Sequence, residues 1–111
     1  MIEVDVQGTG NSAVLRPRGR LTMVTAPQLR AAVAEAVDAQ RVLIVVDLSA
    51  CEFIDSSGLG AIIGGLKQAR QAGGDLRIAR VGSQVATVLQ LTNLDRVLRP
   101  HDTVEGALHD G

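Results

Sequence analysis

Two adjacent serines beside an aspartate are the residues of this sequence best suited to chemistry. They belong to the segment Asp55-Ser56-Ser57-Gly58, which follows Phe53-Ile54 and precedes apolar residues at helical spacing. A strand that runs into a helix here leaves backbone N–H groups unpaired at the positive end of the helix dipole. A phosphate on one of the serines is tolerated at such a position.

Helix capping is an alternative role for the same residues. Asp55, Ser56 and Ser57 all belong to the residue types preferred at helix N-caps, and local physics does not exclude this reading. Gly58 and Gly60 favour a second role, because small residues leave the helix start open to a partner. Gly60 and Gly64 also predict close packing of the helix on a sheet, since an interior glycine costs about 1 kcal/mol.

The sequence offers little support for an enzyme. A serine nucleophile needs a nearby base, but the only histidines are His101 and His109 in a polar C-terminal region, and the chain has no Gly-x-Ser-x-Gly motif. The histidines lack the spacing of a metal pair and are predicted to be solvated. We therefore expect no catalysis, no metal and no cofactor.

The N-terminal residues predict a β-hairpin. Ile2, Val4 and Val6 alternate with polar neighbours, and Ala13-Val14-Leu15 follows a Gly-Thr-Gly-Asn turn sequence.

Two helices and a buried strand are predicted to position the serine segment. The first helix is expected from about residue 26 to 39, with Thr25 as its N-cap. The unbroken apolar run 42–46 is typical of a central strand covered on both faces. The second helix starts at the serines and is expected to end at Gly73-Gly74. Its apolar stripe consists of Leu59, Ile62, Ile63, Leu66 and Ala69.

The remaining pattern indicates an α/β fold. Residues 76–79 predict another strand, Ser83 is expected to cap a third helix, and a short apolar segment at 97–98 precedes a helix near 103–108. Alternating strands and helices imply parallel strands with crossover helices. We predict one domain over residues 1–111, with a mixed sheet of four to five strands and about four helices.

Composition restricts the partners. The net charge is −1 and the eleven Lys and Arg residues are dispersed, which argues against nucleic-acid binding. No apolar stretch approaches the roughly 20 residues of a membrane span. We expect a cytoplasmic protein. The single cysteine, Cys51, is expected to be a small buried apolar residue.

The serine segment also carries a family resemblance. Residues 53–60, Phe-Ile-Asp-Ser-Ser-Gly-Leu-Gly, resemble the corresponding segment of STAS domains of the anti-sigma factor antagonist type. Gly19-Arg20-Leu21 before Thr25-Ala26, Val45-Val46-Asp47-Leu48 and Gly73-Gly74-Asp75-Leu76 match further blocks of that family at fitting intervals. The resemblance covers nearly the whole chain.

The resemblance implies a regulatory cycle. An anti-sigma factor that is also a serine kinase would phosphorylate Ser56, with Ser57 the less favoured position. The unphosphorylated protein would bind that factor and free a sigma factor, phosphorylation would release it, and a serine phosphatase would restore it. The implied partner-binding residues are Asp55, Ser56, Ser57, Gly58, Thr22 and Met23.

One departure keeps a second interpretation open. Members of the family often carry an aspartate where this chain has Thr22, so the kinase contact is in question. The alternative is a constitutive STAS adaptor, either a subunit of an ABC-type transporter or part of a stress-signalling scaffold. Weak homodimerisation is a further expectation.

Overall fold

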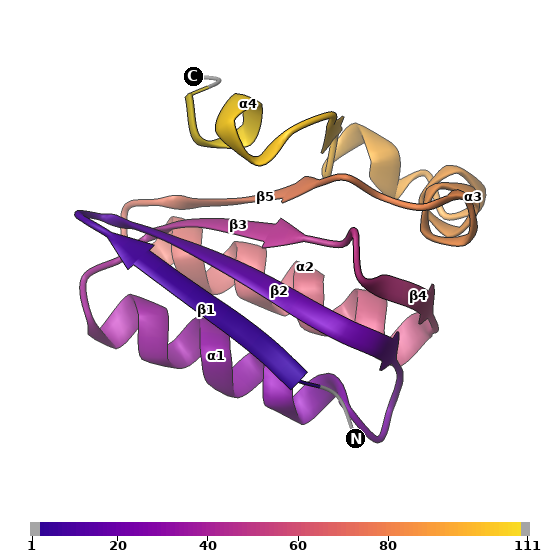
Figure 1. Ribbon diagram of the computed structural model, residues 1–111, viewed down its shortest axis with the longest axis horizontal. Helices are drawn as coiled ribbons and strands as arrows, with labels where there is room; N and C mark the ends of the chain where they lie inside the picture. The colour runs from indigo at the N-terminus through magenta and orange to yellow at the C-terminus, as the bar shows by residue number, and fades with distance from the viewer. Residues whose placement is uncertain (1–2, 110–111) are drawn as a thin grey trace.

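A mixed sheet covered by helices forms the protein (Figure 1). The computed structural model describes residues 3–109, so the predicted strand residue Ile2 lies outside the described part. The strands are β1 (Glu3–Thr9), β2 (Ser12–Leu21), β3 (Leu43–Asp47), β4 (Cys51–Ile54), β5 (Asp75–Ala79) and β6 (Pro100–His101). The helices are α1 (Ala26–Asp38), α2 (Ser56–Gln71), α3 (Ser83–Leu91) and α4 (Val104–His109), with a 3-10 turn at Leu94–Arg96.

The sheet has the predicted mixed character. Its order is β1-β2-β3-β5-β6, and β4 pairs with the far end of β2. The β1–β2 hairpin is antiparallel, whereas all other pairs are parallel. Six strands are present within residues 3–109. The prediction of four to five strands did not include β6, which has only two residues and gives little periodic signal.

A break in β2 allows one strand to pair with two neighbours. The first half of β2 pairs with β3, and the register shifts after Gly19, where pairing with β4 begins. Gly19 has a φ of +102°, a conformation that favours glycine. The shift directs β4, and therefore the start of α2, towards the end of β2.

The helices cover the two sheet faces unequally. α1 and α2 pack against one face and enclose the main core, which contains Leu15, Ile44, Val46, Ile62 and Ile78. On the other face, a smaller cluster joins Val45 and Ala79 to Ala107 of α4. Figure 1 shows α1 and α4 on opposite sides of the strands.

Of the two predicted N-caps, Thr25 is confirmed in position and Ser83 is not. Thr25 is at the N-cap of α1, but its hydroxyl donates to the carbonyl oxygen of Arg20 and makes no cap bond to the helix. Gly82, and not Ser83, is the N-cap of α3. The end of α2 follows prediction more closely, since the helix stops at Gln71 and Gly73 takes a φ of +91° just beyond it.

The apolar elements serve the core. No helix among residues 3–109 is both long and apolar enough to cross a lipid bilayer.

Cys51 is buried as predicted, and this burial raises the pKa of its thiol, whereas hydrogen bonding to Phe53 acts in the opposite direction. The short apolar segment at 97–98 lies just before β6, which forms at Pro100–His101.

Candidate functional site

Asp55 is the residue that caps α2. Its Oδ1 accepts a hydrogen bond from the backbone N–H of Gly58 at 2.9 Å, and its carbonyl oxygen accepts one from Leu59 at 2.9 Å. The extended backbone of Asp55 suits an N-cap. Ser57 therefore does not cap the helix, and neither serine hydroxyl is needed to close its first turn.

The same aspartate contacts the turn that follows β2. Oδ2 of Asp55 accepts a hydrogen bond from the backbone N–H of Met23 at 3.2 Å, and the backbone N–H of Asp55 donates to the carbonyl oxygen of Leu21 at 3.2 Å. The predicted residues Met23 and Asp55 thus lie together, although they are distant in sequence. Thr22 precedes Met23 in this turn.

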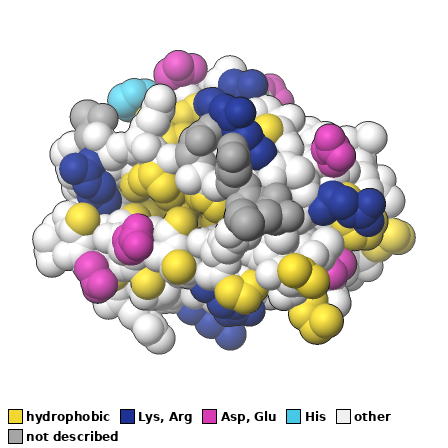
Figure 2. All heavy atoms as spheres, turned by 60° about the horizontal axis from the view of Figure 1, so that its bottom comes forward, with side chains coloured by type: hydrophobic (Ala, Val, Ile, Leu, Met, Phe, Trp, Pro, Cys, Tyr) yellow, Lys and Arg dark blue, Asp and Glu magenta, His cyan; other side chains and the backbone are white. Residues whose placement is uncertain are grey.

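Thr25 holds the 22–25 turn in shape. Its Oγ1 accepts a hydrogen bond from the backbone N–H of Thr22 at 2.9 Å and donates to the carbonyl oxygen of Arg20 at 2.7 Å. The turn presents two apolar side chains to solvent, because Met23 is 72% and Val24 is 80% exposed. Figure 2 shows apolar side chains protruding at the lower right, where this turn lies in Figure 1. Sequence reasoning missed Val24.

The two serines differ in accessibility. Ser56, the first residue of α2, is exposed, whereas Ser57 is half-buried. Within residues 3–109, neither hydroxyl makes a hydrogen bond to another residue. The Ser56 side chain is therefore more accessible from solution than that of Ser57.

The glycines of α2 have two different functions. A Cβ on Gly58 would collide with the carbonyl oxygen of Leu21, so glycine permits the close approach of the helix to β2. The prediction that Gly60 and Gly64 pack against the sheet is wrong. They face the side chain of Arg30 from α1, and the glycine that contacts the core in this stretch is Gly65.

Gln84 of α3 fixes the strand that leads into the site. Its amide oxygen accepts from the backbone N–H of Ile54 at 3.0 Å, and its amide nitrogen donates to the carbonyl oxygen of Ile54 at 3.0 Å. These two bonds replace a neighbouring strand at the edge of β4. The sequence carries no signal for this contact, which joins residues 30 positions apart.

A buried carboxylate stabilises the opposite face of the sheet. Asp47 is fully buried, and its Oδ2 lies 2.9 Å from Nε of Arg16. Burial favours the neutral form of Asp47, but the backbone N–H of Ser49 and the guanidiniums of Arg16 and Arg80 outweigh it and lower the pKa of the carboxyl group. Because side chains alternate along β3, Asp47 lies on the face away from α1 and α2.

The histidines lie outside this site. His109 is exposed, as predicted, whereas His101 is half-buried and lines a pocket near Arg70 at the other end of α2. Within residues 3–109, no three His, Cys, Asp or Glu side chains gather in the way a metal ion requires.

The fold and the site together define a small α/β domain. It presents an exposed serine that takes no part in capping, at the N-terminus of a helix. The model of the STAS domain family matches residues 3–107. The chain therefore belongs to the STAS domain family.

Individual relatives agree with this assignment. Anti-sigma-F factor antagonist RsfB from Mycobacterium tuberculosis is 33% identical over 107 residues, covering 96% of this chain and 87% of that protein. An anti-sigma F factor antagonist from Paenibacillus polymyxa is 28% identical over 108 residues, covering 96% and 92%. The crystal structure of an anti-sigma factor antagonist from Mycobacterium paratuberculosis has a TM-score of 0.85 at 29% identity, covering 97% and 92%.

Some matches are shorter. Two relatives from Thermotoga neapolitana and Thermotoga maritima are 39% and 40% identical, and the matched segment spans 59% and 56% of their lengths.

Proposed function

We propose that the protein is an anti-sigma factor antagonist controlled by phosphorylation of Ser56. The unphosphorylated form binds an anti-sigma factor that is also a serine kinase, and this binding frees a sigma factor. Phosphorylation releases the antagonist, and a serine phosphatase restores it. The protein acts in the cytoplasm by binding, and the phosphoryl-transfer chemistry belongs to its partners.

The exposure of Ser56 at the first position of α2 carries this proposal. Asp55 already supplies the N-cap hydrogen bond of α2, so the helix does not depend on the Ser56 hydroxyl. A kinase can modify it without unfolding the helix start. The half-buried position of Ser57 supports Ser56 as the modified residue.

The neighbourhood of Ser56 suits an electrostatic switch. Asp55 directly precedes Ser56, and its carboxylate binds the backbone N–H of Met23, whose apolar side chain is exposed. A phosphate adds about −1.5 to −2 charges at neutral pH. Next to Asp55 and within a desolvated interface, this charge costs binding free energy through repulsion and lost hydration. Dissociation then requires no change of fold.

The 22–25 turn supports the choice of a binding surface. Met23 and Val24 are among the most exposed large apolar side chains of the described residues, and Asp55 ties their turn to the start of α2. Apolar side chains surrounded by polar groups are typical of the centre of a protein interface. We infer that the partner covers Ser56 together with this turn. Thr22 contributes a backbone hydrogen bond to the turn and no charge.

Mass spectrometry with matched serine variants tests the proposal. Wild type, Ser56→Ala and Ser57→Ala are incubated with ATP and each candidate anti-sigma kinase from the same genome. We expect one phosphate on wild type and on Ser57→Ala, and none on Ser56→Ala. Copurification before and after modification should show that the phosphate abolishes kinase binding.

The charge itself is tested by Ser56→Asp. This variant should bind the anti-sigma factor more weakly than wild type, whereas Ser56→Ala should bind and resist modification. Stable binding to a partner that never modifies Ser56 would contradict the switch and favour a constitutive adaptor of a transporter or scaffold.

A further inference from the structure

A second polar site lies at the opposite end of α2. A pocket of about 260 Å³ opens between the end of α2, the start of β5 and the segment before β6. Its charged or ionisable lining residues are Arg70, Asp75, Arg77, Arg99 and His101. Arg70 lies fourteen positions after Ser56 in α2, a length of about 21 Å. The pocket is therefore separate from the serine site.

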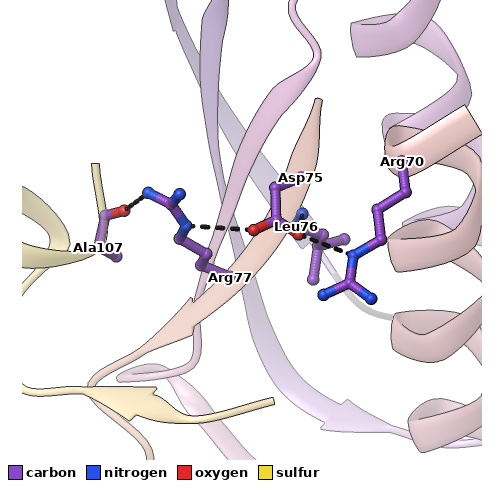
Figure 3. Close-up of polar contacts among 5 residues, drawn as sticks. All are labelled: Arg70, Asp75, Leu76, Arg77 and Ala107. Atoms are coloured by element: carbon purple, nitrogen blue, oxygen red, sulfur yellow. Dashed lines mark hydrogen bonds and ion pairs between the residues drawn. The ribbon is translucent and has the colours of Figure 1, made fainter. Parts of the chain in front are cut away.

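One carboxylate holds two of the guanidiniums in place (Figure 3). Oδ1 of Asp75 lies 3.2 Å from Nε of Arg70, and its Oδ2 lies 3.4 Å from Nε of Arg77. Arg77 also donates from its Nη1 to the carbonyl oxygen of Ala107 at 2.6 Å. Arg77 is thus fixed from both sides, and its side chain is only 19% exposed.

The edge of β5 is open at this pocket. β6 pairs only with Ile78 and Ala79, so within residues 3–109 the start of β5 has no strand on its outer side. The outward backbone N–H of Leu76 instead donates to Oδ1 of Asp75 at 2.9 Å. Two guanidiniums and a backbone N–H converging on one carboxylate are the donor set that proteins use for oxyanions.

The pocket carries more positive than negative charge. Among residues 3–109, Asp75 is the only acidic residue of the lining, whereas Arg70, Arg77 and Arg99 are basic. Three guanidiniums and one carboxylate leave an excess of two positive charges in the lining, although Asp75 contacts both Arg70 and Arg77. Arg99 is exposed and makes no hydrogen bond or ion pair with any residue from 3 to 109. Planar guanidiniums of this kind bind phosphate oxygens in pairs.

We propose that this basic pocket binds the phosphate group of a small dianion, either inorganic phosphate or a short phosphate ester. Arg77 supplies a fixed guanidinium, and Arg70 and Arg99 approach the anion from the rim. The volume suits one phosphate group, because pockets for larger organic ligands occupy about 300–1,000 Å³. This proposal is independent of phosphorylation at Ser56.

Amide chemical shifts test the pocket directly. The protein labelled with ¹⁵N is titrated with inorganic phosphate while sodium chloride holds the ionic strength constant. We expect saturable shifts centred on the amides of residues 75–77, 97–99 and 101. Arg99→Ala and Arg70→Ala should each weaken binding about tenfold, because each removes charge-assisted hydrogen bonds.

Lys67→Ala is the matched control. It removes one exposed positive charge from α2 three residues before Arg70, but Lys67 does not line the pocket. Binding should therefore be unchanged. Shifts that fail to saturate, or an equal loss in Lys67→Ala, would overturn the proposal, since either result means general charge screening.

A second titration distinguishes the two sources of the phosphate group. Ribose 5-phosphate is added under the same conditions as inorganic phosphate. Tighter binding of the ester assigns the pocket to phosphate esters, and equal or weaker binding assigns it to the free ion. The absence of saturable shifts with both probes overturns the proposal. The same spectra show whether each variant is folded.

Discussion

Asp55 and Met23 are joined by a hydrogen bond of 3.2 Å, from the Met23 backbone N–H to Oδ2 of Asp55, across 32 positions of sequence. The other oxygen of the same carboxylate caps α2 through Gly58. One side chain therefore sets both the start of the helix that carries Ser56 and the position of the exposed 22–25 turn. A loss of Asp55 affects both parts of the candidate binding surface.

Two replacements of Asp55 should separate the contribution of its N-cap hydrogen bond from that of its negative charge. We expect Asp55→Ala to lower the free energy of unfolding by about 1–2 kcal/mol, because an N-cap hydrogen bond is lost. Asp55→Asn keeps a side-chain oxygen for the cap and should lose much less. Urea denaturation of the two variants measures the difference. Equal stability of Asp55→Ala and wild type would contradict the capping role.

Two glycines of α2 give a matched pair with opposite predictions. Gly58→Ala should destabilise the protein by about 1–3 kcal/mol, because its Cβ would collide with the carbonyl oxygen of Leu21. Gly60→Ala should stabilise it by about 0.5–1 kcal/mol, since alanine is the better helix former. A Cβ at Gly60 would come no closer than 3.8 Å to Arg30. Thermal unfolding of both variants checks the signs, and a stabilised Gly58→Ala would contradict the close approach.

The sequence predicted the regular elements well because their signals are local. α1 was expected at about 26–39 and is observed at Ala26–Asp38, since an apolar face and Pro27 mark it. The central strand 42–46 and the hairpin followed from apolar runs and alternation. Short strands such as β6 lack enough residues to show a period.

The details of the site depended on long-range contacts. A Ser or Asp near a helix start indicates a cap, but the choice of Asp55 over Ser57 requires the path of the chain out of β4. The reason for Gly58 is an atom of Leu21, and the edge of β4 is held by Gln84 of α3. Neither contact leaves a pattern in the local sequence.

Asp47 should make stability depend on pH. The pKa of Asp47 is lower in the folded protein than its ordinary value of about 4 in an unfolded chain. Its stabilising effect is therefore fully present above pH 4 and is lost as the pH falls through the lower folded pKa. Asp47→Asn should cost about 1.5–3 kcal/mol at pH 7, because the charged hydrogen bond from Arg16 is lost.

Urea denaturation of wild type and Asp47→Asn from pH 7 to pH 3 measures this effect. The difference in unfolding free energy should narrow below about pH 4. Asp38→Asn, at an exposed position of α1, is the control and should change stability at pH 7 much less than Asp47→Asn does. If the difference in unfolding free energy between wild type and Asp47→Asn stays constant down to pH 3, ionisation of Asp47 is not the cause of that difference.

Gln84 should hold the edge of β4 through its two hydrogen bonds to Ile54, at 3.0 Å each. Gln84→Ala leaves both backbone groups of Ile54 without these partners, which should lower the free energy of unfolding by about 1–3 kcal/mol. Hydrogen exchange at the Ile54 amide should accelerate more than exchange in β3, because the opening is local. Gln90→Ala, at an exposed position of the same helix, is the matched control and should leave both measurements unchanged. Equal protection of Ile54 in Gln84→Ala and Gln90→Ala would mean that β4 is held by its pairing with β2 alone.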